Sequence, residues 1–121
     1  MIWLVGSRGM LGRDVEQLLR EKDANFIATD LDVDVTDLNA LHSFSLQKSI
    51  SWIINCSAYT DVDRAEEERE RAFAINALGV HNLAKMAKDL GANLVHISTD
   101  YVFDGTKRGY YTEQELSLIH I

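Results

Sequence analysis

Ile2-Trp3-Leu4-Val5-Gly6-Ser7-Arg8-Gly9-Met10-Leu11-Gly12 is the stretch of sequence that decides the fold. Its first four apolar residues are typical of a buried strand, and they lead directly into a turn with three glycines. Apolar side chains then recur at helical spacing, which predicts an amphipathic helix over residues 10–21. Gly6, Gly9 and Gly12 therefore lie between a strand and a helix, the context in which their spacing predicts a dinucleotide site.

Each glycine has a physical role in such a site. Gly6 permits the tight turn, Gly9 lets the backbone approach a pyrophosphate, and Gly12 lets the helix pack closely on the strand. The amino terminus of the helix adds unpaired N–H donors and partial positive charge. The alternative is an ordinary strand–helix turn, and the flanking elements favour dinucleotide binding over it.

The alternation of strand and helix continues along the chain. Further segments typical of strands lie at residues 26–29, 52–56 and 94–99, and helical patterns lie at 38–44 and 63–90. Thr36 or Asp37 is placed to cap the first of these helices. Asp63 is placed to begin the second and Gly91 to end it. Apolar strands separated by helices predict an α/β protein with a parallel sheet covered on both faces, in a doubly wound, Rossmann-like topology.

Composition narrows the classes of function. With 121 residues, of which 46% are hydrophobic, the chain is expected to form at most one soluble domain. A formal charge of −7 disfavours nucleic acid as a partner, and no apolar run approaches the roughly 18 residues that span a membrane. The single cysteine and the absence of a secretion signal fit a cytoplasmic protein. The four histidines lack metal-ligand spacing, so no metal site is expected.

Acidic residues follow the second predicted strand. Asp30 lies 18 residues after Gly12, where a carboxylate can accept hydrogen bonds from the ribose hydroxyls and favours NAD over NADP. Arg8 in the glycine turn could instead pair with the 2′-phosphate of NADP, so both cofactors stay open. Asp34, next to Val35, either accepts a hydrogen bond from the adenine amino group or is a solvated carboxylate of a turn.

Two more polar segments follow predicted strands. The small residues of Asn55-Cys56-Ser57-Ala58-Tyr59-Thr60 suit a cofactor that passes over strand ends, and Cys56 is interpreted as a packing residue because no cation is placed to lower its pKa. Ser98-Thr99-Asp100-Tyr101-Val102-Phe103-Asp104-Gly105 follows the last strand, at the edge where open α/β sheets bind ligands. His96 is interpreted as a strand residue with its hydrogen bonds satisfied. Asn76 either bonds backbone in the site or faces water.

Four segments together resemble the extended short-chain dehydrogenase/reductases and, within them, the dTDP-4-dehydrorhamnose reductase family. They are GSRGMLG at residues 6–12, NCSAYTDVDRAE at 55–66, INALGVHNLA at 75–84 and HISTDYVFDG at 96–105. The resemblance covers about residues 1–115 and implies NADPH or NADH as cofactor. It implies that the cofactor is lined by Gly9, Met10, Leu11, Asp30, Asp34, Val35, Ala58, Tyr59 and Thr60, with Ile97 below it.

The resemblance also implies a chemistry. Thr99 and Asp100 would meet a nucleotide-sugar substrate, and Thr99 would hydrogen-bond its carbonyl oxygen as part of a Thr/Tyr/Lys constellation. The tyrosine donates a proton to the C4 ketone while NAD(P)H delivers hydride, and the lysine lowers the tyrosine pKa. The implied activity is the reduction of dTDP-4-dehydro-L-rhamnose to dTDP-L-rhamnose. A homodimer of the full-length protein and a need for Mg²⁺ stay open, and no feature of the sequence supports Mg²⁺.

The chain departs from the family pattern near its carboxyl end. By the resemblance, the Tyr-x-x-x-Lys pair falls about one position beyond Ile121, and no tyrosine in the chain has a lysine four residues later. Residues 1–115 are therefore expected to be a partial NAD(P)-binding Rossmann domain that ends before the later strands and the sugar-binding region. Residues 116–121 are expected to be a non-native or unstructured tail, with a genuine short strand as the alternative.

Two functions follow from this departure. Without the proton donor, the chain is expected to be an inactive amino-terminal portion of the reductase. The alternative is a non-catalytic NAD(P)-binding regulatory module, related to the regulatory subunit of methionine adenosyltransferase.

Overall fold

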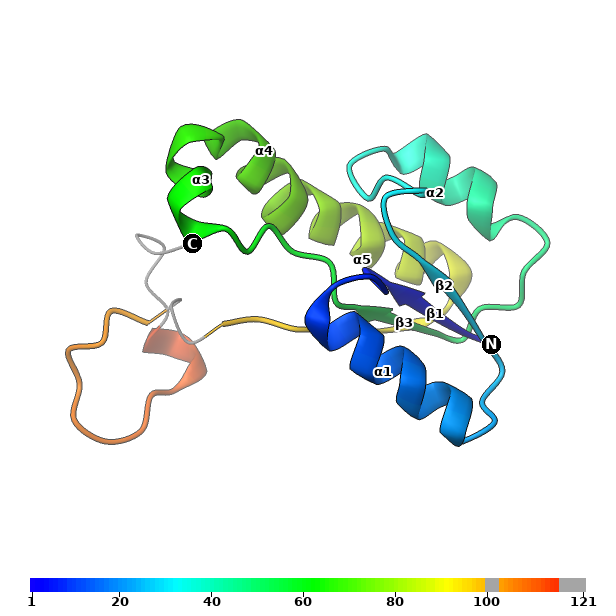
Figure 1. The fold of residues 1–121 in the computed structure, drawn as a ribbon, viewed down its shortest axis with the longest axis horizontal. Coiled ribbons are helices and arrows are strands. Elements are labelled where there is room, and N and C mark those ends of the chain that lie inside the picture. Colours follow the sequence, from blue (N-terminus) through cyan, green and yellow to red (C-terminus); the bar gives the residue numbers. More distant parts are fainter. Residues whose placement is uncertain (100–102, 116–121) are drawn as a thin grey trace.

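A computed structural model describes residues 1–99 and 103–115 as a parallel sheet with helices on both of its faces (Figure 1). The strands are β1 (Ile2–Val5), β2 (Phe26–Thr29), β3 (Trp52–Asn55) and β4 (Asn93–His96). Their order in the sheet is β2-β1-β3-β4, and all three pairings are parallel. The chain therefore leaves β1 toward one edge and returns to the other side of β1. This reversal is the switch point of a doubly wound sheet, which confirms the predicted fold class.

The helices divide between the two faces of the sheet. One face carries α1 (Met10–Glu21), and the other carries α2 (Leu38–Ser45) and α5 (Gly79–Leu90) (Figure 1). The chain reaches α5 through α3 (Val62–Glu67), α4 (Arg69–Phe73) and a π-helical turn, η1 (Ala74–Leu78). Within the described ranges, no helix is both long and apolar enough to cross a membrane.

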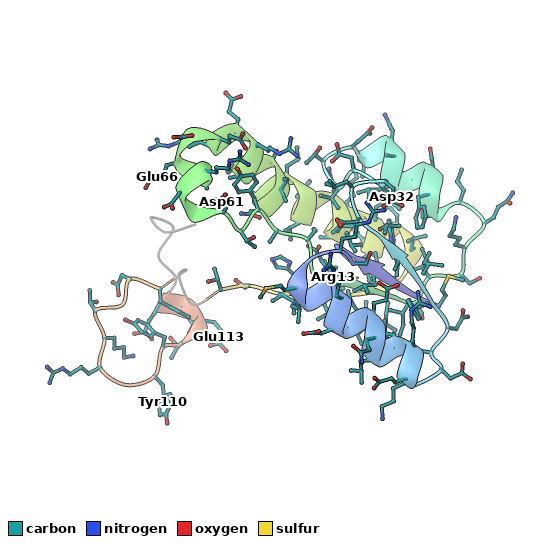
Figure 2. All side chains as sticks on the ribbon, viewed as in Figure 1. Arg13, Asp32, Asp61, Glu66, Tyr110 and Glu113 are labelled. Carbon is teal, nitrogen blue, oxygen red and sulfur yellow. The ribbon has the colours of Figure 1, made fainter. Side chains whose placement is uncertain are left out.

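Residues 103–115 form a loop that extends away from the sheet, where Figure 2 labels Tyr110 and Glu113. Phe103 stacks on Tyr111 with ring centroids 4.6 Å apart, and Lys107 Nζ lies 2.7 Å from a Glu115 carboxylate oxygen. The loop ends in a short 3-10 turn, η3 (Glu113–Glu115). These contacts join residues of the same loop, so its shape is set by local interactions.

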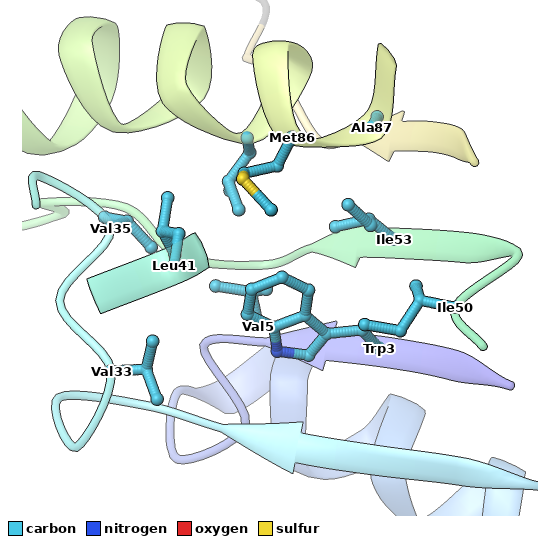
Figure 3. Close-up of a cluster of buried hydrophobic side chains, with 10 residues drawn as sticks. Trp3, Val5, Val33, Val35, Leu41, Ile50, Ile53, Met86 and Ala87 are labelled. Carbon is cyan, nitrogen blue, oxygen red and sulfur yellow. The ribbon is translucent and has the colours of Figure 1, made fainter. Parts of the chain in front are cut away.

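The hydrophobic core lies between the sheet and the α2–α5 layer (Figure 3). Trp3 and Ile53 from the strands, Leu41 from α2 and Met86 from α5 are all fully buried there. The indole of Trp3 donates a hydrogen bond of 2.9 Å to Thr29 Oγ1, so its one polar atom is satisfied. Burying each large apolar side chain is worth about 1.5–3 kcal/mol. This layer therefore fixes β1 and β3 relative to each other.

The opposite face of the sheet is covered only in part. Leu4 is fully buried beneath α1, but Trp52 and Val95 on the same face are 45% and 39% exposed. The expectation that the strands are covered on both faces is thus confirmed for β1 and wrong for β4. The reason is that α1, the one described helix on this face, packs on β1 and does not reach β4.

Helix ends follow local hydrogen bonding. Asp37 caps α2, with its carboxylate accepting from two backbone N–H groups, and Gly91 ends α5 with φ of 64°, as expected. The predicted start at Asp63 is wrong: Asp61 caps α3, because its carboxylate accepts a bond of 3.1 Å from Arg64 N. The helical region expected to run to residue 90 is confirmed, with a break at Glu68, where φ is −110° and ψ is 49°.

Candidate functional site

The glycine turn lies at the switch point, between the carboxyl ends of β1 and β3. Gly6 has φ of +81°, and a Cβ added to it would lie 2.5 Å from Ser57 N. A Cβ on Gly12 would lie 1.9 Å from Gly6 O. Both positions therefore exclude a side chain, as the tight turn and the close helix packing require. At Gly9 the nearest atom to an added Cβ is 3.7 Å away, which leaves room for a ligand to approach the backbone.

The amino terminus of α1 presents unpaired backbone donors beside this turn. Gly9 is the N-cap and has no side-chain cap, and the first helical bond runs from Arg13 N to Gly9 O at 3.0 Å. In the described part of the chain, no acceptor is paired with the N–H groups of Met10, Leu11 and Gly12. Such donors, with the helix dipole behind them, stabilise an anion.

Asp30 follows β2, and β2 is tied to the glycine turn. Thr29 O accepts hydrogen bonds of 2.9 Å from Gly6 N and 3.1 Å from Ser7 N. Asp30 is half-buried, and within residues 1–99 and 103–115 no group donates to its carboxylate. Its backbone N–H donates to the side chain of Asp32 at 2.6 Å. The Asp30 carboxylate is thus held near the turn with its acceptor sites unused by the described residues.

Asp34 and Val35 lie in the segment after β2 and differ in environment. Asp34 Oδ1 accepts from both the N–H and the hydroxyl of Thr36, at 2.9 and 2.7 Å, which favours the turn alternative over the adenine contact. Val35 is buried with 8% of its surface exposed, and its carbonyl accepts a bond of 3.0 Å from Asn82. Val35 therefore belongs to the core, and cofactor contacts by these two residues stay predictions.

The loop after β3 is held by an amide side chain from η1. Asn76 Oδ1 accepts from Tyr59 N at 2.8 Å, and Asn76 Nδ2 donates to Tyr59 O at 3.2 Å. Of the two alternatives for Asn76, the structure therefore shows the bond to backbone. Ala58 and Thr60, on either side of Tyr59, are exposed and available to a ligand. A π-helical turn is often found where a helix meets a functional site, and η1 has this position here.

Two side chains of this loop have shifted pKa values. Tyr59 donates a hydrogen bond of 2.7 Å to Glu68, and that bond, with the nearby negative charge, raises the pKa of the phenol. Burial raises the pKa of the Cys56 thiol, which keeps it protonated. Cys56 is therefore a packing residue, as its sequence context indicates, and its N–H bonds Val5 O at 2.8 Å.

Asn55 has a role that the sequence pattern did not identify. It is the last residue of β3 and is buried with 1% of its surface exposed. Its Oδ1 accepts from Ser57 N at 2.9 Å and from the Ser57 hydroxyl, and its amide lies 3.1 Å from His96 Nδ1. An amide at the end of an otherwise apolar strand is the signal that could have drawn attention to it.

The residues that are expected to contact the substrate follow the end of β4. β4 ends at His96, three residues earlier than predicted, and Ile97 N donates a long bond of 3.4 Å to Asn55 O. Ile97 is 47% exposed and Thr99 is also exposed. Asp100 and the predicted tail at 116–121 lie outside the described residues. Among the residues that are described, no cluster of His, Cys, Asp or Glu could hold a metal ion.

A parallel sheet with a glycine turn and a free helix amino terminus at its switch point defines the class of Rossmann-like α/β domains. The sequence model of the RmlD substrate binding domain family matches residues 1–117, and the chain belongs to this family.

Relatives of known name agree with this assignment. The chain is 41% identical to a dTDP-4-dehydrorhamnose reductase of Mycolicibacterium smegmatis, over 99% of this chain and 37% of that protein. A crystal structure of a dTDP-4-dehydrorhamnose reductase from Clostridium acetobutylicum superimposes with a TM-score of 0.86 at 43% identity, covering 93% of this chain and 40% of the other. One from Bacillus anthracis, in complex with NADP, has a TM-score of 0.82 and 36% identity, covering 88% and 38%. The chain thus spans about two fifths of the length of these relatives.

Proposed function

We propose that this chain is the cofactor-binding part of an NAD(P)H-dependent reductase that converts dTDP-4-dehydro-L-rhamnose to dTDP-L-rhamnose. The observation that carries the proposal is the amino terminus of α1, beside a turn that excludes side chains at Gly6 and Gly12. No group among the described residues accepts from the N–H donors of residues 10–12 there. Its relatives carry that activity in their names, and one of them was crystallised with NADP.

The residues of this chain fit a dinucleotide. The N–H groups at the start of α1 would hold the pyrophosphate, and the open space at Gly9 would admit it. Asp30 would accept hydrogen bonds from the adenosine ribose, and the loop at Ala58, Tyr59 and Thr60 would border the nicotinamide side. When bound, the cofactor supplies hydride to a carbonyl carbon.

Thr99 would act at the substrate side of the same edge. Its hydroxyl would donate a hydrogen bond to the carbonyl oxygen, while Asp100 would contact the sugar. We propose that the proton donor is the tyrosine of a Tyr-x-x-x-Lys pair, which these 121 residues do not contain. The 121-residue chain is accordingly expected to bind cofactor and to lack reductase activity, since loss of general acid catalysis costs about 10²–10⁴ in rate.

Cofactor binding tests this proposal directly. NADPH and NADH are titrated into the chain while the fluorescence of its two tryptophans is followed. Gly9→Ala is the matched variant, because its added methyl meets no atom closer than 3.7 Å but fills the space a pyrophosphate needs. Ser43→Ala is the control, since Ser43 is exposed near the end of α2, on the face of the sheet opposite α1.

The expected result is saturable binding that Gly9→Ala weakens at least tenfold and that Ser43→Ala leaves unchanged. No binding of either nucleotide, or equal binding by Gly9→Ala, would contradict the proposed site.

A second assay separates the reductase from a non-catalytic regulatory module. Such a module would share the cofactor site at the start of α1 and would differ from the reductase in lacking turnover. The protein encoded by the complete gene is assayed for oxidation of NADPH with the keto sugar. Turnover supports the reductase, whereas cofactor binding without turnover supports the module.

A further inference from the structure

A hydrogen-bond relay connects β4 to the loop that faces the glycine turn. Asn55, at the end of β3, lies between His96 on β4 and Ser57 in the loop. One atom of its amide group lies 2.9 Å from Ser57 N, and the other lies 3.1 Å from His96 Nδ1. Asn55 and His96 are register partners in the sheet, so the relay crosses directly from one strand to the next.

The backbone N–H of Ser57 determines which groups in this relay donate and which accept. A backbone N–H can only donate, so the amide atom of Asn55 that faces Ser57 N must be the oxygen. The NH₂ group of Asn55 must then face His96 Nδ1. Because an NH₂ group donates, Nδ1 has to accept and carries no proton. This arrangement requires a neutral imidazole at His96, with its proton on Nε2.

The relay ends at the wall of the candidate cofactor site. Ser57 N is the atom that a Cβ on Gly6 would approach to 2.5 Å, so Ser57 lies directly against the glycine turn. A displacement of Ser57 would open or crowd the turn whose backbone is proposed to receive the pyrophosphate. The position of Ser57 is in turn set by the orientation of the Asn55 amide.

We infer that His96 is a positioning residue of the dinucleotide site, which holds the Asn55 amide so that its oxygen faces Ser57. This inference rests on the proposed function for the identity of the ligand. A hydrogen-bond donor at position 96 would be opposed to the Asn55 NH₂ group. It would favour rotation of the Asn55 amide by about 180°, which would place the NH₂ group against the Ser57 N–H. The His96 side chain lies at the exposed end of β4, and partial desolvation there lowers its pKa, which favours the neutral ring that the relay needs.

The first arm of the test locates the proton on His96. In a chain labelled with ¹⁵N-histidine, two-dimensional NMR distinguishes a bare ring nitrogen from a protonated one. At neutral pH the expected result is a bare Nδ1 and a protonated Nε2. A protonated Nδ1 would overturn the inference, whatever the chain binds.

The second arm measures the dissociation constant for NADPH in matched variants. His96→Leu removes the acceptor, whereas His96→Asn places an amide oxygen close to the position of Nδ1. His81→Leu is the control, because His81 is exposed on α5. Loss of one hydrogen bond predicts a dissociation constant raised roughly 3- to 10-fold in His96→Leu. His96→Asn and His81→Leu are expected to stay within about twofold of the parent chain, because each keeps the relay.

Exchange of the Ser57 amide proton keeps the inference separable from the proposed function. Faster exchange in His96→Leu, reversed in His96→Asn, shows that His96 positions Ser57 even in a chain that binds no NADPH. A parent chain that binds no NADPH overturns the proposed function. Unchanged exchange and unchanged affinity in His96→Leu overturn the role of His96. If His96→Leu fails to fold, the role of His96 is decided by two other measurements. These are the location of the proton on His96 and the affinity of His96→Asn for NADPH.

Discussion

Two loops flank the switch point of the sheet, and they are held in place by different means. The glycine turn at residues 6–9 is held by backbone: its N–H groups bond Thr29 O, and an added side chain at Gly6 would collide with main-chain atoms. The loop at residues 56–60 is held mainly by side chains, with the amides of Asn55 and Asn76 bonding its backbone. Backbone packing tolerates no added atom, whereas each amide contact can be removed singly. The two loops should therefore differ in their response to mutation.

The largest effect is expected from an added methyl in the backbone-held turn. A Cβ on Gly12 would lie 1.9 Å from Gly6 O, so Gly12→Ala must displace α1 from β1. We expect a loss of at least about 1–3 kcal/mol in the free energy of unfolding, as for other overpacked sites. Urea denaturation followed by circular dichroism measures it.

Gly9→Ala is the matched control for this effect. An added Cβ there is 3.7 Å from the nearest atom, an ordinary contact, so the change in stability should stay within about 0.5 kcal/mol. If Gly12→Ala and Gly9→Ala were equally stable, the turn would not be held by close backbone packing.

A smaller effect is expected from the loop held by side chains. Asn76→Ala removes both bonds to the backbone of Tyr59, each worth about 0.5–1.5 kcal/mol in net stability. The Tyr59 amide should then exchange with solvent faster, while the core keeps its protection. Hydrogen exchange monitored by NMR measures both regions at once.

Asn82→Ala provides the comparison for this loop. Asn82 is also an asparagine of the same helical region, but it donates to Val35 O and lies away from Tyr59. Loss of the Asn82 side chain should lower the free energy of unfolding of the chain. The Tyr59 amide should still exchange with solvent only when the whole chain unfolds. Equal exchange at Tyr59 in both variants would mean that Asn76 does not hold the loop.

The contrast between the loops also explains what could be predicted from sequence. The helix over 10–21 and the close packing at Gly12 follow from a local pattern, because Gly12 approaches Gly6, six residues away. The Asn55–His96 contact joins residues 41 positions apart, and it depends on a strand register that no local pattern specifies. For the same reason the local pattern allows two environments for Asn76, because its partner Tyr59 is 17 residues away.

The incomplete cover of β4 shows a second limit. An apolar strand sequence indicates that a strand is suited to burial, and Leu94 does pack against the core. Val95, on the opposite face, is exposed because no described helix lies over it. Whether an apolar face is covered depends on the rest of the fold, so sequence pattern predicts the suitability of a strand better than its actual environment.

A charge change beside the glycine turn should alter the choice of cofactor without altering stability. Asp30→Ala removes the carboxylate that would repel the 2′-phosphate of NADP. An interaction of about 1 kcal/mol between charges at contact in water predicts roughly a fivefold shift of the affinity ratio toward NADPH over NADH. Fluorescence titration with both nucleotides measures this ratio.

Asp32→Ala is the control for Asp30. It removes an equal charge two residues away, although it also removes the acceptor for Asp30 N. A ratio that shifts equally in both variants would indicate a general effect of charge. An unchanged ratio in Asp30→Ala would exclude the contact between Asp30 and the ribose.

The smallest effect concerns the phenol of Tyr59. Tyr59 lies in the loop at residues 56–60, and its hydroxyl donates a hydrogen bond to Glu68. The hydrogen bond and the negative charge of Glu68 raise the pKa of Tyr59 above its ordinary 10.0. Because the folded-state pKa is raised, the stability it contributes is complete below pH 10.0 and is lost as the pH rises toward the folded-state pKa.

Glu68→Gln should therefore lower the Tyr59 pKa toward its ordinary value, whereas Glu67→Gln, one residue earlier in α3, should leave it unchanged. Ultraviolet titration of tyrosinate, with Tyr59→Phe to assign the signal, measures the shift. A Tyr59 pKa that does not respond to Glu68→Gln would mean that this contact is absent in solution. The loop after β3 would then depend on the asparagine amides alone, which sharpens its contrast with the backbone-held turn.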